Sequence, residues 1–168
     1  MSEIQLDVRL ALTADMQEIM RIFRSARAFM RSSGNLHQWV NGYPSEELLL
    51  EDIEKKQLFV ICRGDVLCGV FAFIIGDDPT YEVIEDGKWI SDSAYGTIHR
   101  IGGDGTVHGI LKTAVEYAEK RIGHLRIDTH EDNLPMQRAV TRNGFVRCGI
   151  IYLEDGSPRI AYEKESST

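Results

Sequence analysis

The sequence predicts a single α/β (α+β) domain, spanning residues 1–168, in which helices cover the faces of a sheet. Three observations favour this fold class. Apolar residues alternate with a period of two in several short segments, they recur at helical spacing in others, and the two kinds of segment interleave along the chain. A chain of 168 residues is long enough to bury one substantial core without disulfides.

Local patterns place the elements of the first half of the chain. Alternating apolar residues predict strands, and apolar residues at helical spacing behind a capping side chain predict helices. The predicted elements are a strand over 3–11 that includes Ile4, a helix from a cap at Thr13 to about Gly34, a helix over 45–55, and strands over 58–63 and 66–75. Gly64-Asp65, between the last two strands, is typical of a two-residue hairpin turn.

The second half begins with an acidic, turn-rich segment over residues 77–94. A loop of this length in a compact domain is usually functional or mobile. The patterns then predict a strand over 97–101, a helix over 107–121, a strand over 125–129, a helix over 133–142, and a hairpin with strands over 145–153 and 159–162. Asp155-Gly156 would form the turn of this hairpin.

The composition argues against several classes of function. With 26 acidic and 19 basic residues the formal charge is -7, which argues against nucleic acid and favours cationic partners such as amines. The longest apolar run, Val70–Ile75, has strand length, so no membrane partner is expected. The first residues lack a basic secretion signal and the three cysteines lack close spacing, so we expect a cytoplasmic protein with reduced thiols. No metal-ligand spacing is present, and no metal is expected.

A glycine-rich turn between a predicted strand and a predicted helix carries the clearest functional signal. Residues 101–110 read IGGDGTVHGI, and the helix that follows would begin with unpaired N–H groups. Such amides bind phosphates, and glycine lets the backbone approach them closely. A glycine cluster by itself also fits a flexible turn, and this one matches neither a Walker loop nor the dinucleotide-binding spacing.

A second polar stretch follows the next predicted strand. It reads LRIDTHEDN over 125–133, and Asn133 could simply cap the helix that follows. Together with the glycine-rich turn, the segments GTIHRI, RIDTHEDNLPMQRAV, NGFVRCGIIY and RIAYEK resemble the GNAT superfamily of acetyl-CoA-dependent N-acetyltransferases, in its branch of small bacterial proteins. The resemblance covers nearly the whole chain in element order and is sharpest from Thr97 to Lys164.

The resemblance implies a mixed, mostly antiparallel sheet whose two central strands splay apart, with acetyl-CoA as co-substrate between them. The pantetheine arm would pair with the backbone of Ile101, Gly102 and Gly103, and Asn133 would border it. The family's phosphate loop falls on residues 106–111. The amides expected to hold the diphosphate are those of Val107, His108, Gly109, Ile110 and Leu111.

The sequence departs from the family pattern at several points. Thr106 stands where Arg or Gln is usual, Leu111 stands where a small residue is usual, and the turn before Gly109 is about two residues short. Because backbone amides do most of the phosphate binding, CoA binding is still expected. Many relatives carry a helix tyrosine that protonates the leaving thiolate, and that position is Val140 here. The general acid must then be another group or water.

Acetyl transfer to an amine needs a group that takes the amine proton and an N–H that faces the carbonyl oxygen. His99 lies on the strand before the cleft, and His130 and Glu131 end the facing strand, so we name these three as catalytic candidates. An ordinary strand histidine for His99 and a solvated loop for His130 and Glu131 are the structural alternatives. A backbone N–H near Ile101 or Gly102 would face the oxygen.

The resemblance implies that the first two helices and the long loops build the acceptor side. Phe29, Trp39 and Tyr43 are the candidates for acceptor binding, with Trp89 and Tyr152 as further aromatics, and packing beneath the helices is the alternative. Aromatics at a pocket mouth suit small organic amines or a side chain.

The sequence therefore predicts an N-acetyltransferase that transfers acetyl from acetyl-CoA to a primary amine of a small molecule or peptide by direct attack. The acidic stretch over 77–86 favours a cationic acceptor. The alternatives are a non-catalytic CoA-binding or sensor module and an acyltransferase that uses another acyl-CoA. A homodimer is allowed.

Overall fold

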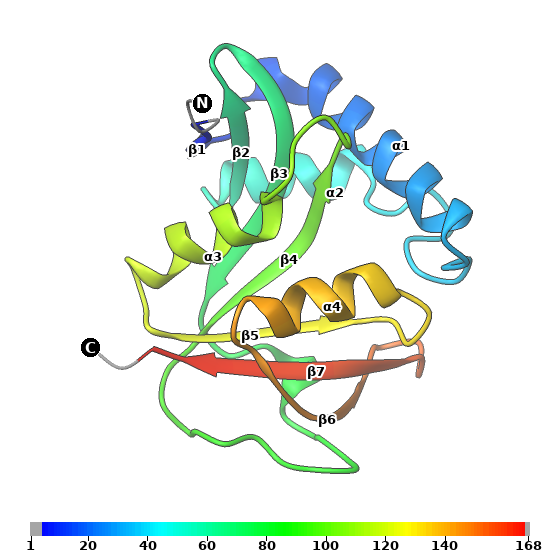
Figure 1. The fold of residues 1–168 in the computed structure, drawn as a ribbon, viewed down its shortest axis with the longest axis vertical. Coiled ribbons are helices and arrows are strands. Elements are labelled where there is room, and N and C mark those ends of the chain that lie inside the picture. Colours follow the sequence, from blue (N-terminus) through cyan, green and yellow to red (C-terminus); the bar gives the residue numbers. More distant parts are fainter. Residues whose placement is uncertain (1–4, 167–168) are drawn as a thin grey trace.

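Seven strands form one sheet in the order β1-β2-β3-β4-β5-β7-β6 in the computed structural model, which describes residues 5–166 (Figure 1). The strands are β1 (Asp7–Leu10), β2 (Leu58–Arg63), β3 (Val66–Ile75), β4 (Gly96–Gly103), β5 (His124–Thr129), β6 (Val146–Tyr152) and β7 (Pro158–Glu165). Neighbours are antiparallel except for β4 and β5, which run parallel. The mixed, mostly antiparallel sheet is thus confirmed.

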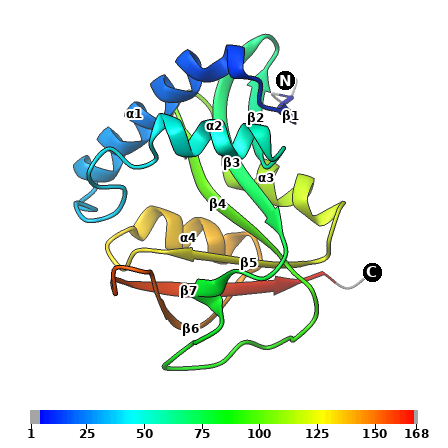
Figure 2. The same cartoon turned by 180° about the vertical axis from the view of Figure 1, so that it is seen from behind.

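The two central strands part after a very short contact. β4 pairs with β5 through Gly96 with Leu125 and through Thr97 with Arg126. Beyond these pairs β4 continues beside β3, whereas β5 continues beside β7. The view from behind shows β4 diverging from β5, which crosses the molecule next to β7 (Figure 2). The splay that the resemblance implies is therefore confirmed, and it frees one edge of β4.

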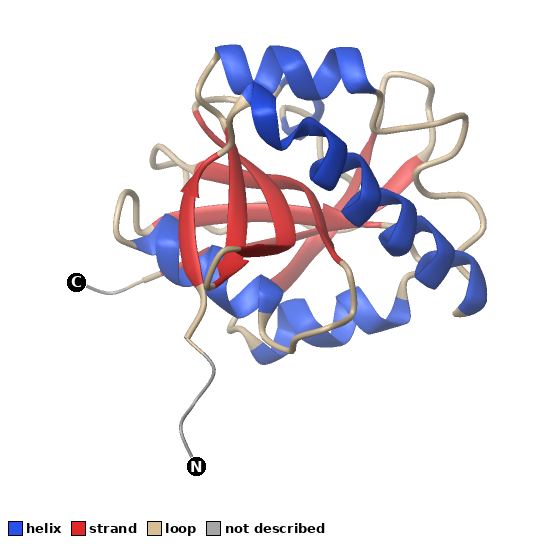
Figure 3. Ribbon diagram, turned by 90° about the horizontal axis from the view of Figure 1, so that it is seen from above, coloured by secondary structure: helices blue, strands red, loops and turns tan. Residues whose placement is uncertain are grey.

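Helices cover both faces of the sheet (Figure 3). α1 (Met16–Ser32) and α2 (Glu46–Glu54) pack on one face, and α3 (Ile110–Glu119) and α4 (Leu134–Arg142) pack on the other. The buried residues of α1 recur at helical spacing and form one apolar stripe: Met16, Ile19, Ile22, Phe23 and Ala26. Among residues 5–166, no helix is long and apolar enough to cross a membrane.

The start of the chain differs in detail from the sequence prediction. The strand predicted over 3–11 comprises Asp7–Leu10, and Ile4 lies outside the described residues. Thr13 does not cap α1. The Asp15 carboxylate instead accepts the amide of Leu12 at 2.8 Å and closes a 3-10 turn in front of the helix. Asp15 is the N-cap residue of α1 by position, but its carboxylate binds the amide in front of the 3-10 turn, so α1 begins without a side-chain cap.

The helix that follows the glycine-rich turn starts later than predicted. It begins at Ile110 rather than at 107, because Gly109 takes a left-handed φ of +86° that cannot continue a right-handed helix. The predicted hairpin over 58–75 is confirmed, with both strand boundaries as expected and Gly64 at φ +61° in its turn.

The acidic segment over 77–94 is tied to the sheet rather than loose. The indole Nε1 of Trp89 donates to the carbonyl of Tyr81 at 2.9 Å. The amide of Ile90 donates to the Glu163 carboxylate on β7 at 2.7 Å. A backbone bridge joins Glu85 to Ile150 on β6. The segment therefore packs along the β7-β6 end of the sheet.

Glu163 anchors this segment from within the core, where it is 2% exposed. Its carboxylate contacts the imidazole of His124 and lies 3.6 Å from Nε of Arg126. Burial alone would raise the pKa of Glu163, but the Ile90 amide, His124 and Arg126 hold it below its ordinary value. The Arg126 guanidinium also stacks 3.9 Å from the ring centre of Trp89, which links the loop to β5.

The three cysteines are free thiols in the interior. Burial raises the pKa of Cys62 and of Cys68 above the ordinary value. Burial, reinforced by the neighbouring Glu163 carboxylate, raises the pKa of Cys148 to about 11. All three sulfurs therefore stay protonated at neutral pH.

The anchoring role of Glu163 is tested by Glu163→Gln, which keeps the side-chain shape and removes the charge. The free energy of unfolding should fall by about 3 kcal/mol at neutral pH, because Arg126 is left buried without its counter-charge. The pKa of Glu163 is depressed on folding, so its contribution is complete above the ordinary value of 4.5 and is lost as the pH falls through the folded pKa. Urea unfolding of both proteins across the acidic range measures this.

The matched control is Glu165→Gln, which removes the same charge from the exposed end of the same strand. It should change the free energy of unfolding by less than about 0.5 kcal/mol. Equal losses in the two variants would contradict the anchoring role.

Candidate active site

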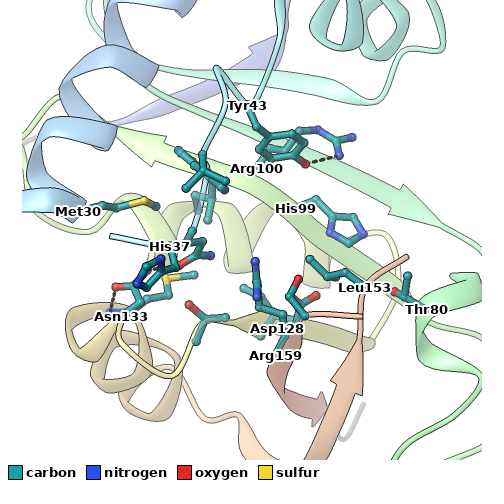
Figure 4. Close-up of a pocket in the computed structure, with 18 of the residues that line it drawn as sticks. Met30, His37, Tyr43, Thr80, His99, Arg100, Asp128, Asn133, Leu153 and Arg159 are labelled. Carbon is teal, nitrogen blue, oxygen red and sulfur yellow. Dashed lines mark hydrogen bonds between the residues drawn. The ribbon is translucent and has the colours of Figure 1, made fainter. Parts of the chain in front are cut away.

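Two cavities open beside the parted end of β4 and meet there. The larger, of about 620 Å³, carries most of the charged side chains and is called the polar cavity below (Figure 4). The smaller, of about 390 Å³, lies between α1, β4, α3 and α4 and is called the glycine-lined cavity. Four residues line both cavities: Met30, Ile101, Asn133 and Met136. A molecule in one cavity can therefore reach a molecule in the other.

A β-bulge in β4 lies at this junction. Ala72 of β3 pairs with His99 and Val70 pairs with Gly102, so three steps along β4 match two steps along β3. Within the bulge Arg100 has a φ of +48°, a left-handed conformation that is uncommon for a residue with a side chain. A bulge bends its strand, and this bend falls where the cavities join.

Arg100 braces the bulge against α2. Its Nε and Nη2 donate to the two carboxylate oxygens of Asp52, each at 2.9 Å, and its Nη1 donates to the Tyr43 hydroxyl at 3.3 Å. Burial raises the pKa of Asp52 although Arg100 opposes the change, so the attraction does not fully offset the desolvation of this carboxylate. We therefore assign this ion pair a geometric role, which is to fix the bulge and the segment that carries Tyr43.

The glycine-lined cavity presents backbone at its centre. A Cβ on Gly103 would lie 3.0 Å from the Ile110 side chain, so glycine lets α3 approach β4 closely. The first hydrogen bond of α3 runs from Thr113 N to Gly109 O at 2.9 Å. Within the described chain the amides of 107–112 donate to no acceptor. Unpaired amides at the start of a helix attract anionic groups.

Most of the residues predicted to bind acetyl-CoA line this cavity: Ile101, Gly102, Gly103, Val107, Ile110, Leu111 and Asn133. His108 and Gly109 line neither cavity, although their amides belong to the unpaired set. Asn133 also caps α4 by accepting the Met136 amide at 3.2 Å, and its Nδ2 donates to Gln38 at 3.1 Å. Asn133 therefore caps α4, as the structural alternative expects, and it also lies at the cleft.

The turn before α3 is held by its own carboxylate. Asp104 accepts the amide and the hydroxyl of Thr106 at 3.0 and 2.6 Å, and it pairs with Arg21 of α1 at 3.2 Å. Thr106 therefore orders the turn where relatives carry a longer side chain. Arg21 offsets the negative charge that Asp104 places near the unpaired amides.

His99 faces the polar cavity with a carboxylate behind it. Its Nε2 lies 2.9 Å from the Asp78 carboxylate, which also accepts the amide and hydroxyl of Thr80 at 2.9 and 2.7 Å. Burial alone would raise the pKa of Asp78, but the bonds from His99 and Thr80 lower it to about 2. Asp78 is therefore charged at neutral pH and orients an imidazole that can exchange protons with a bound molecule.

The opposite side of the polar cavity carries a carboxylate and a guanidinium next to each other (Figure 4). Asp128 of β5 accepts the Tyr81 hydroxyl at 2.6 Å. Arg159, at the start of β7, is 8% exposed and donates to the carbonyl of Pro158 at 2.8 Å. Arg100 of β4 does not pair with Asp128, because Arg100 is held by Asp52.

The fold matches solved structures along its whole length. An acetyltransferase of the GNAT family from Streptococcus agalactiae is 30% identical, with 97% of this chain and 96% of that chain aligned and a TM-score of 0.88. This chain belongs to the GNAT family. GNAT acetyltransferases from Listeria monocytogenes and Bacillus cereus share the fold at 22% and 18% identity, with TM-scores of 0.69 and 0.64 over 96% and 98% of this chain and 95% and 99% of theirs. No protein-family model and no curated protein matches the chain.

Membership in the GNAT family supports acyl transfer as the general activity. The helix position that holds a tyrosine in many GNAT relatives is Val140, which is 0% exposed and packs in the core below α4. Val140 lines neither cavity, and valine carries no proton to donate. Proton delivery to a leaving group must come from elsewhere in this GNAT protein.

The aromatic candidates for acceptor binding separate between the two cavities. Trp39 and Tyr43 line the polar cavity. Phe29 lines the glycine-lined cavity instead, because it follows Ala26 on the side of α1 that faces this cavity. Trp89 and Tyr152 line neither cavity: one stacks on Arg126, and the other donates to Glu85 at 3.1 Å.

The catalytic candidates separate in the same way. His99 lines the polar cavity, whereas His130 and Glu131 line neither cavity. His130 Nδ1 accepts the amide of Asp132 at 3.0 Å, and burial lowers its pKa. Glu131 is exposed to solvent. The solvated-loop alternative describes Glu131, whereas His130 is buried without lining either cavity. His99 is the candidate that a substrate in the polar cavity can touch.

The acidic stretch contributes one carboxylate to the cavity. Asp78 lines it, but Glu85 and Asp86 turn toward β6, where they contact Tyr152 and Arg147. The reason is that the segment runs along the far end of the sheet. Sequence reasoning did not place Asp78 beside His99, because nothing in the local pattern connects a loop carboxylate to a strand 21 residues later.

Asp128 was not predicted as a cavity residue, and Arg159 was considered for the acceptor side with core or edge pairing as the alternative. A signal for Arg159 was present, because strand alternation puts it on the same side of β7 as Ala161, which is 0% exposed. A cation at such a position is unusual. Among residues 5–166, no cluster of three or more His, Cys, Asp or Glu side chains could hold a metal ion.

The brace on the bulge is tested by Asp52→Asn. It leaves Arg100 half-buried without a counter-charge, and the free energy of unfolding should fall by about 3 kcal/mol. Replacing both partners, Asp52→Leu with Arg100→Leu, should recover most of this loss, because neither charge remains to be desolvated. Glu51→Gln, an exposed neighbour on the same helix, serves as the control. Denaturant unfolding measures all three, and an Asp52→Asn loss no larger than that of the control would refute the brace.

Proposed function

We propose that this GNAT protein transfers the acetyl group of acetyl-CoA to a primary amine of a small molecule or peptide. The observation that carries the proposal is the meeting of the two cavities at Ile101, where β4 has lost its β5 partner. One cavity offers unpaired amides to an anionic donor, and the other offers titratable side chains to an acceptor. Transfer between two substrates requires a separate site for each, and the two adjoining cavities provide them.

The donor is assigned to the glycine-lined cavity. The amides of 107–112 are matched in charge and spacing to a diphosphate. The free edge of β4 from Ile101 to Gly103 can pair with the amides of an extended pantetheine arm, as a missing strand would. The thioester would then lie at the junction of the two cavities.

The acceptor amine attacks from the polar cavity. Its lone pair forms a C–N bond to the thioester carbonyl carbon, the C–S bond breaks, and the electron pair leaves with sulfur as CoA thiolate. The proton released by the amine passes to His99, which Asp78 orients. A backbone N–H near Ile101 or Gly102 faces the carbonyl oxygen as it gains negative charge. Because Val140 is buried, water protonates the thiolate.

A non-catalytic CoA-binding module is the second candidate function. The observation that favours it is Val140, since the position used for proton return in many relatives lies in the core here. Binding of acetyl-CoA is common to both candidates, whereas turnover separates them.

Donor binding is tested by thermal shift. A ligand that binds the folded state at a hundredfold excess over Kd adds about 2.7 kcal/mol, which raises the Tm of a domain this size by roughly 5–10 °C. NAD and ATP should give smaller shifts, because neither has the pantetheine arm. Gly109→Asp places a negative charge beside the unpaired amides and should abolish most of the shift. Gly109→Asn places a side chain of similar size at the same φ of +86° but adds no charge, so it should retain the thermal shift. Equal shifts in the two variants would reject this phosphate site.

Transfer itself is tested by release of CoA thiol from acetyl-CoA in the presence of polyamines, amino acids, aminoglycosides and short peptides. Once an amine substrate is identified, His99→Gln should lower kcat by about 100-fold or more, because no side chain then takes up the amine proton. The KM for acetyl-CoA should not change, since His99 does not line the donor cavity. His37→Gln, in the same polar cavity but without a carboxylate partner, should lower kcat by less than about 10-fold. Comparable losses in both would remove His99 from the reaction.

A further inference from the structure

Arg159 is a buried cation in the polar cavity, and no ion pair of residues 5–166 includes it, although Asp128 and Asp155 line the same cavity. Its side chain is 92% buried, and the hydrogen bond it makes within residues 5–166 goes to the neutral carbonyl of Pro158. The other arginines of the interior are paired: Arg126 contacts Glu163, and Arg100 makes two bonds to Asp52. Arg100 also lines the polar cavity, but Asp52 occupies its guanidinium, whereas Arg159 makes no such pair.

An unpaired guanidinium in such a place is unfavourable for the protein alone. Burial lowers the pKa of Arg159, which is the mark of a cation held away from water. A guanidinium has five N–H donors in a planar fork, and a neutral carbonyl uses one of them. The remaining donors are free to meet an oxygen pair that arrives in the cavity, and a carboxylate fits this fork with two parallel bonds.

Asp128 narrows the kind of anion that could arrive. It lies beside Arg159 in the cavity wall, so its carboxylate is near the fork (Figure 4). A doubly charged phosphate would be repelled there, whereas a single carboxylate on a molecule that also carries a positive end would meet complementary charges. The cavity of about 620 Å³ has the size of a small-molecule site.

We propose that Arg159 binds the carboxylate of the acceptor, and that the acceptor is therefore an amine that also carries a carboxylate, of the amino-acid class. The proposal rests on the proposed acetyl transfer. Arg159, His99 and Ile101 line the same cavity, so one bound molecule can place its carboxylate on the Arg159 fork and its amine toward His99 and the thioester (Figure 4). Arg100 cannot take this role, because Asp52 already occupies its fork.

The experiment compares α-amino acids with the amines that remain when their carboxylate is removed. Pairs such as histidine with histamine and phenylalanine with phenethylamine share a side chain and an amine and differ in the carboxylate. Free amino acids and dipeptides form two arms, which separate a free amino acid from a peptide C-terminus. Acetyl transfer is followed by CoA thiol release, and binding is followed separately by calorimetry in the presence of CoA.

Wild-type protein should acetylate the carboxylate-bearing member of a pair with the higher kcat/KM. Arg159→Gln should lower kcat/KM for that member by roughly 10- to 100-fold, the loss of a charge-assisted pair, and should leave the decarboxylated amine nearly unaffected. Arg159→Lys should have a kcat/KM between those of wild type and Arg159→Gln, because an ammonium lacks the planar fork of a guanidinium. Arg147→Gln, on the same hairpin but outside both cavities, is the control and should change neither rate.

A structural role for Arg159 would give a different result. Because no carboxylate depends on it, Arg159→Gln should melt within a few degrees of wild type and should keep the acetyl-CoA thermal shift. A large loss of stability, or an equal loss of rate for both members of a pair, would reject the proposal. So would a wild-type preference for the decarboxylated amines.

The two proposals fail in different ways. If no amine of either kind is acetylated, acetyl transfer to such amines is refuted, and calorimetry then decides on Arg159 by itself. Binding of the amino acids in preference to the amines, lost in Arg159→Gln, would uphold the carboxylate site. Binding of neither set, or binding that Arg159→Gln does not alter, would overturn it.

Discussion

Two residue pairs, Gly96 with Leu125 and Thr97 with Arg126, form the backbone ladder between β4 and β5, and the functional architecture depends on this short ladder. A longer ladder would satisfy the edge of β4 with β5 and close the space in which both cavities lie. A shorter one would leave the two halves of the sheet without a junction. The bulge at Arg100 adds to the divergence, since the extra residue bends β4 where the strands have already parted.

Charge pairing holds the segments around this opening. Glu163 ties the loop over 77–94 to the sheet, Asp52 ties the bulge to α2, and Asp78 ties the same loop to His99. Each pair joins elements that are distant in sequence, so each fixes a loop or a bulge against a neighbouring element. Buried pairs contribute little net stability, and their value here is that they fix one arrangement of the cavity walls.

Much of the fold was predictable because its signals are local. The Gly64-Asp65 turn, the apolar stripe of α1 and the glycine-rich turn before α3 each determine structure within a few residues. The site was less predictable, because the partners of its charged side chains depend on the register of paired strands and on how helices cross the sheet. Phe29 illustrates the limit: its place on α1 is clear from periodicity, but which cavity that face meets depends on how α1 crosses β4. Asp78 and Arg159 depend likewise on loop packing and on the pairing of β7 with β5.

The buried cysteines bear on the chemical environment that acetyl transfer would create. Each turnover would release a free thiol next to the protein, and thiols exchange with disulfides and attack oxidised sulfur through the thiolate form. With pKa values raised by burial, to about 11 for Cys148, the protein's own sulfurs are poor partners for such exchange. The chain can therefore work among accumulating CoA and its disulfide without becoming a mixed disulfide itself, and its redox state is uncoupled from that of its product.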